Sequence, residues 1–379
     1  MNFVALKMLV ADRAKYFGLI FAIAFASFLL ANQVGIFIGI MTRPASQIRD
    51  AVDADIWVMD PQTLYDGEVY SLPDNDLYRV RSVPGVKWAV PLYLGTGRAI
   101  APDGKFRTLI LMGVDDATLV GVPRKMLVGS IYDLRQPDAA ILDKAGYEYF
   151  FPGEPLQAGK TLQMNDKRVL IVGISDASAP FQSLPVLHTR YSQALQYVGR
   201  ERNLLSFVLA KPALGVSAEE VCHRIASATG LRARTSQEFS WDAFRFYMKN
   251  TGIPVNFGIT VMVALIVGTV VAGQTFYIFT IENLKQFGAL KAIGVTNRRI
   301  VGMILLQALV VGGTGYAFGM GMAAAFFSGF VGYGPTRGII LPWQVMAGIA
   351  VVVLFVVGLA SLMSVRRALV LEPAVVFRS

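Results

Sequence analysis

The sequence predicts a membrane protein with four transmembrane α-helices and a large α+β domain outside the membrane, inserted between the first and second helix. Of its 379 residues, 54% are hydrophobic and only 16% are charged, against about 25% in a typical soluble domain. Uncharged runs long enough to cross a bilayer lie near the N-terminus and in the last third of the chain. Residues 43–250, between them, carry charges, prolines and turn signals instead.

The N-terminal part predicts two helices. Residues 1–15 combine basic side chains with the apolar residues Phe3, Leu6, Leu9 and Val10, which suits a cytoplasmic amphipathic helix on the inner membrane face. Residues 16–42 contain no charge and predict the first transmembrane helix. This run exceeds the roughly 7–15 residues of a signal-peptide core, and no small-x-small cleavage site follows, so we expect it to be retained.

Three further transmembrane helices are expected at residues 251–281, 300–330 and 342–365. A cytoplasmic loop at 282–299, an external loop at 331–341 and a cytoplasmic tail at 366–379 separate and follow them. Lys and Arg number three in the N-terminus, four in the 282–300 stretch and three in the tail, but only one, Arg337, in the 333–341 stretch. The positive-inside rule therefore predicts both termini inside and the 43–250 domain outside.

The 43–250 domain mixes predicted strands and helices. We expect strands at 55–59, 87–100, 106–114, 161–164, 168–174 and 204–209, with a hairpin turn at Asn165–Asp166. Helices are expected at 73–82, 139–150, 191–198, 217–229 and 240–250, the last being aromatic and leading into the bilayer. This order indicates an α+β domain of one or two lobes.

Catalytic, metal and nucleotide sites are not indicated. Cys222, His188 and His223 lack partners at a recognisable spacing, and one cysteine excludes an internal disulfide. The Lys160-Thr161 pair follows Gly153 and Gly159 with five residues between the glycines, whereas a P-loop needs four before its Gly-Lys pair. The net charge is +9. The basic residues flank apolar runs and form no patch, so they indicate membrane topology rather than nucleic-acid binding.

The predicted spans contain no Asp, Glu, Lys, Arg or His at mid-span, which argues against proton- or ion-coupled transport. They contain two GxxxG pairs, Gly35 with Gly39 and Gly315 with Gly319. Such pairs let helices approach closely, either within one chain or at a dimer interface. The sequence leaves both alternatives open.

The most informative stretch is 282–300, ENLKQFGALKAIGVTNRRI, between two apolar runs. It predicts a short amphipathic helix that stops at Gly294, with an apolar side made of Phe287, Ala289, Leu290, Ile293 and Val295. Periodicity and charge alone leave two alternatives open, an ordinary cytoplasmic loop and a docking site for a cytoplasmic partner.

This stretch and the layout resemble the MacB/FtsX superfamily of ABC-transporter permeases. The hallmark motif lies between spans two and three and here reads Lys285, Phe287, Gly288, Leu290, Lys291, Ala292, Ile293 and Gly294, followed by Arg298-Arg299. The tail, with Arg366-Arg367-Ala368 and Glu372-Pro373-Ala374, resembles the family's ending, and the Asp53–Pro61 stretch is most similar to the DevC-like branch.

The resemblance implies a MacB-like, type VII ABC permease: a non-catalytic subunit of an ATP-driven exporter in the bacterial inner membrane. It implies a separate cytoplasmic ATPase that binds ATP and Mg, a second permease copy, a periplasmic membrane-fusion adaptor and an outer-membrane channel. No cofactor is expected in this chain. The coupling helix that docks the ATPase would comprise Glu282, Lys285, Gln286, Phe287, Gly288, Leu290, Lys291, Ala292, Ile293 and Gly294.

Three alternatives share this layout. A signalling subunit would activate a cell-wall hydrolase, a lipoprotein-extracting permease would act on membrane-anchored cargo, and a membrane-anchored binding domain would need no ATPase. The sequence does not name the cargo.

Overall fold

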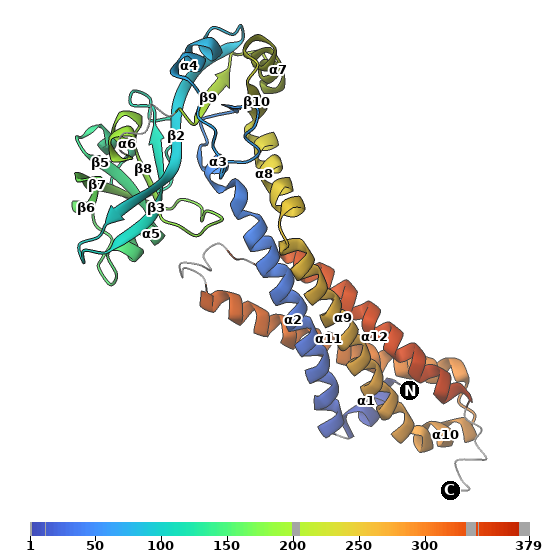
Figure 1. Cartoon of the computed structure of the whole chain (residues 1–379). Coiled ribbons are helices and arrows are strands. Elements are labelled where there is room, and N and C mark those ends of the chain that lie inside the picture. The colour runs from blue at the N-terminus through green and yellow to red at the C-terminus, as the bar shows by residue number, and fades with distance from the viewer. Residues whose placement is uncertain (1, 12, 199–204, 331–338, 340, 371–379) are drawn as a thin grey trace. The chain divides into compact units, whose positions relative to one another are not determined.

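The computed structural model describes residues 2–11, 13–198, 205–330, 339 and 341–370, which form two compact units (Figure 1). The membrane unit is drawn from residues 1–39, 252–331 and 339–379, and the α+β unit from residues 40–251. Most of the predicted external loop at 331–341 and residues 371–379 of the predicted tail lie outside the described residues.

The regular elements described in the membrane unit are all helices. Its elements are α1 (Asn2–Ala11), α2 (Arg13–Met41), α9 (Ile253–Glu282), α10 (Leu284–Ala292), α11 (Asn297–Phe330) and α12 (Trp343–Val370). In the part of the chain that the structure describes, four helices are long and apolar enough to cross a membrane, within Tyr16–Asp50, Ile253–Glu282, Asn297–Gly329 and Trp343–Ser361. The predicted four-span architecture is confirmed.

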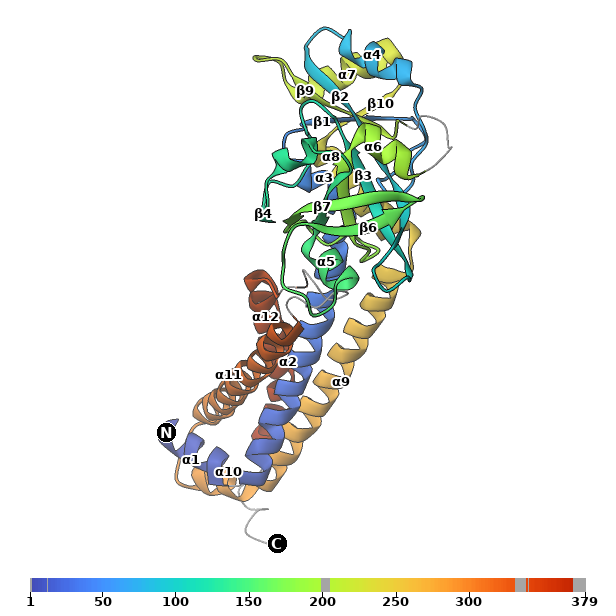
Figure 2. The ribbon, with the colours of Figure 1, turned by 90° about the vertical axis from the view of Figure 1, so that its left-hand side faces the viewer.

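These helices pack through a shared apolar cluster with close contacts at small residues. α12 packs against α9 and α11, and α2 runs beside α9 in Figure 2, with Phe37 and Phe257 in ring contact at 5.5 Å. α1 lies against α11, where the Gln307 Nε2 donates to the Ala5 carbonyl at 2.7 Å. Leu9 of α1 is buried, while Phe3 and Val10 are exposed.

The α+β unit is built on one ten-stranded sheet, in the order β10-β1-β9-β2-β3-β8-β5-β7-β4, with β6 pairing β2 and β7. The long strand β2 (Val86–Ile100) joins two lobes: its first half pairs with β9 (Phe207–Pro212) and its second half with β3 (Phe106–Val114). The sequence left one or two lobes open, and the structure has two that share this strand. The other strands are β1 (Ile56–Met59), β4 (Met126–Val128), β5 (Ala139–Asp143), β6 (Lys160–Met164), β7 (Lys167–Ser175), β8 (Val186–Arg190) and β10 (Arg232–Thr235).

Helices cover the two lobes, and several end as the sequence indicates. Ser217 caps α7 (Ala218–Thr229) through the Glu220 amide, and Gly230 closes it with a left-handed φ of 73°. The hairpin turn between β6 and β7 places Asn165 and Asp166 at φ 48° and 60°, as the Asn-Asp pair predicts. The remaining helices are η1 (Arg43–Ala45), α3 (Ser46–Asp50), α4 (Asp74–Arg81), η2 (Ile131–Arg135), α5 (Lys144–Phe150), α6 (Tyr191–Tyr197) and α8 (Ser236–Asn250).

The helix predicted at 139–150 is wrong in its first half. Ala139–Asp143 forms β5, a fully buried strand between β7 and β8, and only Lys144–Phe150 is helical. A short apolar run that is buried on both faces has no alternation to distinguish it from a helix. The Asp143 side chain accepts the Gly146 amide and so caps α5 at the junction.

The expected strand at 204–209 begins later, at Phe207, and the expected helix at 240–250 begins earlier, at Ser236. Thr235 and Glu238 form a capping box at this start: the Glu238 amide donates to Thr235 Oγ1 at 3.1 Å, and the Thr235 amide donates to Glu238 Oε2 at 3.0 Å. The box fixes the first turn of α8 four residues before the aromatic stretch.

The central core of the α+β unit is aromatic. Trp57 of β1, Phe207 of β9 and Phe239 of α8 are all fully buried, with ring centroids 5.3–5.9 Å apart. This triad fixes α8 onto the sheet. It also places the start of the helix that leads to α9 on a rigid support.

Phe207→Ala should destabilise the α+β unit by about 3–5 kcal/mol, because it removes a fully buried ring and leaves a cavity. Denaturant unfolding of the full chain, followed by tryptophan fluorescence, would measure this, since Trp57, Trp88 and Trp241 lie in that unit. Tyr132→Ala, at a 60% exposed side chain, is the control and should change stability little. Equal losses in both variants would contradict the assigned core.

Candidate functional site

The segment between α9 and α11 is a short helix with defined ends. α9 stops at Glu282, Asn283 forms the corner, and α10 runs from Leu284 to Ala292. Gly294 has a left-handed φ of 90°, and the Val295 amide donates to the Leu290 carbonyl at 3.0 Å. This closing geometry needs a residue without a Cβ, which explains the glycine in the motif.

One face of α10 is anchored in the membrane unit. Phe287 is 1% exposed and clusters with Ile300 and Ile304 of α11 and Val365 of α12. Partly buried side chains that pack around this cluster are Met8, Leu290, Val295 and Val301. The phenyl ring of Phe287 therefore joins α10 to three other helices.

The opposite face is exposed. Ile293 is 77% exposed, which is unusual for an isoleucine beside a charged helix. The other exposed residues of the predicted site are Glu282, Lys285, Gln286, Ala292 and Gly294. Phe287 and Gly288 are buried, while Leu290 and Lys291 are intermediate.

The sequence placed Phe287, Leu290 and Ile293 on one apolar side, and the structure separates Ile293 from the other two. Six residues at about 100° each put Phe287 and Ile293 well apart around the helix. The helical period predicts this separation. Ile293 lies four residues after Ala289 and therefore on the same side of the helix, and Ala289 is also exposed.

Basic side chains stand beside this exposed face. Arg298 and Arg299 are exposed in the first turn of α11, and Lys285 is exposed on α10. Cations at a helix N-terminus are disfavoured by the helix dipole. Their position is therefore better suited to an anionic partner than to the stability of α11.

The four singled-out glycines lie at contacts within the chain. A Cβ on Gly319 would lie 2.4 Å from the Ala24 carbonyl oxygen of α2, and one on Gly315 would lie 2.8 Å from the Ile23 Cβ. A Cβ on Gly35 would meet the Phe327 ring at 2.6 Å, and one on Gly39 would meet the Ile339 Cα at 2.9 Å. Gly35, Gly315 and Gly319 thus lie at contacts between helices of one chain, and Gly39 lies at a contact with the segment before α12.

The residues considered for catalysis are structural. Burial lowers the pKa of His188 to about 3 and raises the pKa of the Cys222 thiol to about 12, so both are uncharged core groups. Lys160 pairs with Glu154 at the start of β6. Among the described residues, no three His, Cys, Asp or Glu side chains gather as metal ligands would.

Family models match most of the chain. Residues 17–228 match the MacB-like periplasmic core domain, more than half of the chain, and residues 258–373 match the FtsX-like permease C-terminal domain. The second match contains α10 and its exposed face.

Known proteins show the same likeness. The chain is 25% identical over 311 residues to uncharacterized ABC transporter permeases of Mycobacterium tuberculosis, Rv0072 of strain H37Rv and MT0078 of strain CDC 1551, covering 80% of this chain and 78% of each relative. Among solved structures, the periplasmic region of MacB from Actinobacillus actinomycetemcomitans is 17% identical at a TM-score of 0.39, covering 54% of this chain and 96% of that one. The extracellular domain of the transporter YknZ from Gram-positive bacteria is 16% identical at a TM-score of 0.35, covering 48% and 98%.

Gly319→Ala and Gly321→Ala should have opposite effects. Both positions lie in the same turn of α11, but a Cβ at Gly321 meets nothing within 4 Å. Alanine favours a helix over glycine by about 1 kcal/mol at both sites, whereas the clash with Ala24 should cost about 1–3 kcal/mol at Gly319 alone. Thermal unfolding in one detergent would measure both variants, and a Gly319→Ala protein as stable as Gly321→Ala would refute the assigned contact.

Proposed function

Because the chain belongs to the MacB/FtsX superfamily of ABC-transporter permeases, we propose that it is the transmembrane subunit of an ATP-driven exporter, moved by a separate cytoplasmic ATPase. The observation that carries the proposal is α10: the exposed Ile293 directly follows the helix, and the buried anchor Phe287 lies on another side of it. A partner that moves the exposed face must move the anchored helices as well.

The exposed face of α10 is the proposed ATPase-docking surface. Ile293 would insert into an apolar groove, and Lys285 with Arg298 and Arg299 would face acidic side chains around it. Apolar anchors surrounded by charged residues are the usual anatomy of a protein interface. Phe287, Gly288 and Leu290 then hold the helix rather than contact the ATPase. ATP and Mg would be bound by that partner, and this chain would be non-catalytic and hold no cofactor.

The α+β unit offers a way to receive the movement. η1 and α3 follow α2 directly in the chain, α8 precedes α9, and α8 packs on both η1 and α3. A displacement of α2 or α9 would therefore reach one packed group of helices in the α+β unit. Since the spans carry no ionisable residue at mid-span, we propose that cargo is expelled by motion of this unit and does not pass through the bilayer.

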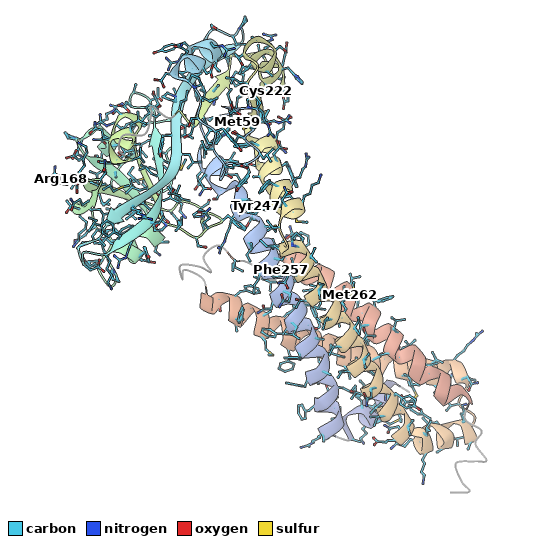
Figure 3. All side chains as sticks on the ribbon, viewed as in Figure 1. Met59, Arg168, Cys222, Tyr247, Phe257 and Met262 are labelled. Carbon is cyan, nitrogen blue, oxygen red and sulfur yellow. The ribbon has the colours of Figure 1, made fainter. Side chains whose placement is uncertain are left out.

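The wider assembly follows from the family and the DevC-like stretch at Asp53–Pro61. We propose a homodimer in the inner membrane with cytoplasmic termini, working with a periplasmic adaptor and an outer-membrane channel. The four packed glycines are used within the chain, so the dimer contact would use another face. Of the four spans that the structure describes, α9 is the most exposed. Its Met262, labelled in Figure 3, is 63% exposed, and Ile259 is 59% exposed.

Ile293→Asp should weaken binding to the ATPase at least tenfold. Burying an isoleucine contributes about 1.5–3 kcal/mol, each 1.4 kcal/mol is about tenfold in Kd, and a carboxylate would oppose the groove. Co-purification of the full chain with the ATPase, and export by the reconstituted pair, would measure the loss.

Two variants serve as controls for this substitution. Leu214→Asp changes a leucine of the α+β unit that is 95% exposed and should leave ATPase binding intact. Phe287→Ala should lower thermal stability as well as coupling, because its ring is buried. Unchanged ATPase binding and export in Ile293→Asp would refute the docking surface. Recovery of a cell-wall hydrolase or a lipoprotein in place of an adaptor would favour the corresponding alternative.

A further inference from the structure

The α+β unit contains a cavity of about 240 Å³ that the coupling mechanism does not use. Its walls come from segments far apart in the sequence: η1 and α3, the stretch after β1, the middle of β2 and β3, the loop before β8, and α8. The residues that matter to the argument are Gln47, Asp66, Leu94, Ile110, Phe181 and Tyr247. Tyr247 lies on α8 in Figure 3.

Asp66 is a buried carboxyl group on the wall of this cavity, only 8% exposed. Its hydrogen bonds come from the backbone amides of Asp66 and Gly67, and no ion pair of Asp66 is found among the described residues. Burial raises the pKa of Asp66 to about 7, because removing a carboxylate from water disfavours its charged form. Such a group is a strong attractor for a cation that enters the cavity.

Gln47 supplies a second polar group that is buried without a complete set of partners. It is 6% exposed, and its Oε1 accepts a hydrogen bond from Ser46 Oγ at 2.9 Å. Its Nε2 has no hydrogen-bond partner in the described structure. A buried, unpaired amide donor is costly unless a ligand or water satisfies it.

The rest of the wall is aromatic and aliphatic. The rings of Phe181 and Tyr247 lie 4.0 Å apart between centroids, and Leu94 and Ile110 complete the apolar side. Aromatic faces attract organic cations. One carboxylate is too few for Ca²⁺, which takes six to eight oxygen ligands, so an organic cation fits this set of groups better than a metal.

We propose that this cavity binds a small protonated arylalkylamine, with its ammonium group paired to the Asp66 carboxylate and its ring against Phe181 and Tyr247. Gln47 contributes to the wall beside these groups. The site involves the α+β unit alone. Binding would therefore hold even if the proposed ATPase coupling failed.

The pH dependence of binding follows from Asp66. The other titratable group on the wall is Tyr247, and Tyr65 interacts electrostatically with it; burial raises the pKa of both phenols, so both stay neutral between pH 5.5 and 8. Charged groups near the wall are Glu68 and Arg43. Glu68 interacts electrostatically with Tyr65, and Arg43, next to Pro44 of the wall, donates a hydrogen bond to Ser183 Oγ. Amine binding requires the carboxylate, so affinity should fall as the pH drops through about 7. The fall should be about thirtyfold between pH 8 and pH 5.5.

Calorimetry on the full chain in zwitterionic lipid nanodiscs would test this, with 2-phenylethylamine as the probe and 2-phenylethanol as its neutral counterpart. Empty nanodiscs give the background of partitioning into lipid. The native chain should bind the amine at least tenfold more tightly than the alcohol. Asp66→Asn should abolish that preference, whereas Asp166→Asn, which removes the same charge at an exposed turn, should retain it.

Phe181→Ala gives a second, independent readout on the aromatic part of the wall and should weaken amine binding at least fivefold. Folding of Asp66→Asn is checked by thermal unfolding. In the native chain the raised pKa costs stability as the pH rises from about 4 through 7, so the variant should be at least as stable at pH 8. Equal binding of amine and alcohol, pH-independent binding, or undiminished binding in Asp66→Asn would overturn the proposal.

Discussion

The close approach of α2 and α11 is the contact on which the membrane unit depends. Helices in a bilayer gain little from hydrophobic burial and rely on packing between small residues. Here Gly315 and Gly319 bring α11 onto the backbone of α2 at Ile20 and Ala24. α1, which precedes α2 in the chain, then lies on α11, and Met8 reaches the cluster around Phe287. The support of α10 therefore begins with two glycines that have no chemistry of their own.

The α+β unit follows a different rule, because polar groups there can be satisfied by water or by one another. Its core of Trp57, Phe207 and Phe239 is apolar and well packed. The cavity around Asp66 differs from this apolar core, because a buried carboxyl group and an unpaired amide both belong to its wall. Natural cores seldom keep such groups without a use. A site for a charged small molecule accounts for both.

The sequence predicted what depends on local pattern. Long uncharged runs identified the four spans, the Asn165–Asp166 pair identified a hairpin, and Gly230 marked the end of α7. It failed where tertiary contacts decide: β5 was taken for a helix because its burial comes from β7 and β8. The helical period alone places Ile293 and Phe287 on different sides of the helix, although both are apolar. The cavity could not be predicted at all, since its walls come from six distant segments.

Short connections join α2 and α9 to the helices of the α+β unit. α2 ends at Met41 and η1 begins at Arg43, while α8 ends at Asn250 and α9 begins at Ile253. One extended residue spans at most about 3.6 Å, so the two residues between α8 and α9 reach at most about 7 Å and the one residue between α2 and η1 about half of that. Under the proposed coupling, displacements larger than these connections can absorb would pass into η1, α3 and α8, which pack on one another. Those same elements supply Gln47 and Tyr247 to the cavity wall. A displacement of α2 or α9 that these short connections cannot absorb would therefore act on the cavity as well.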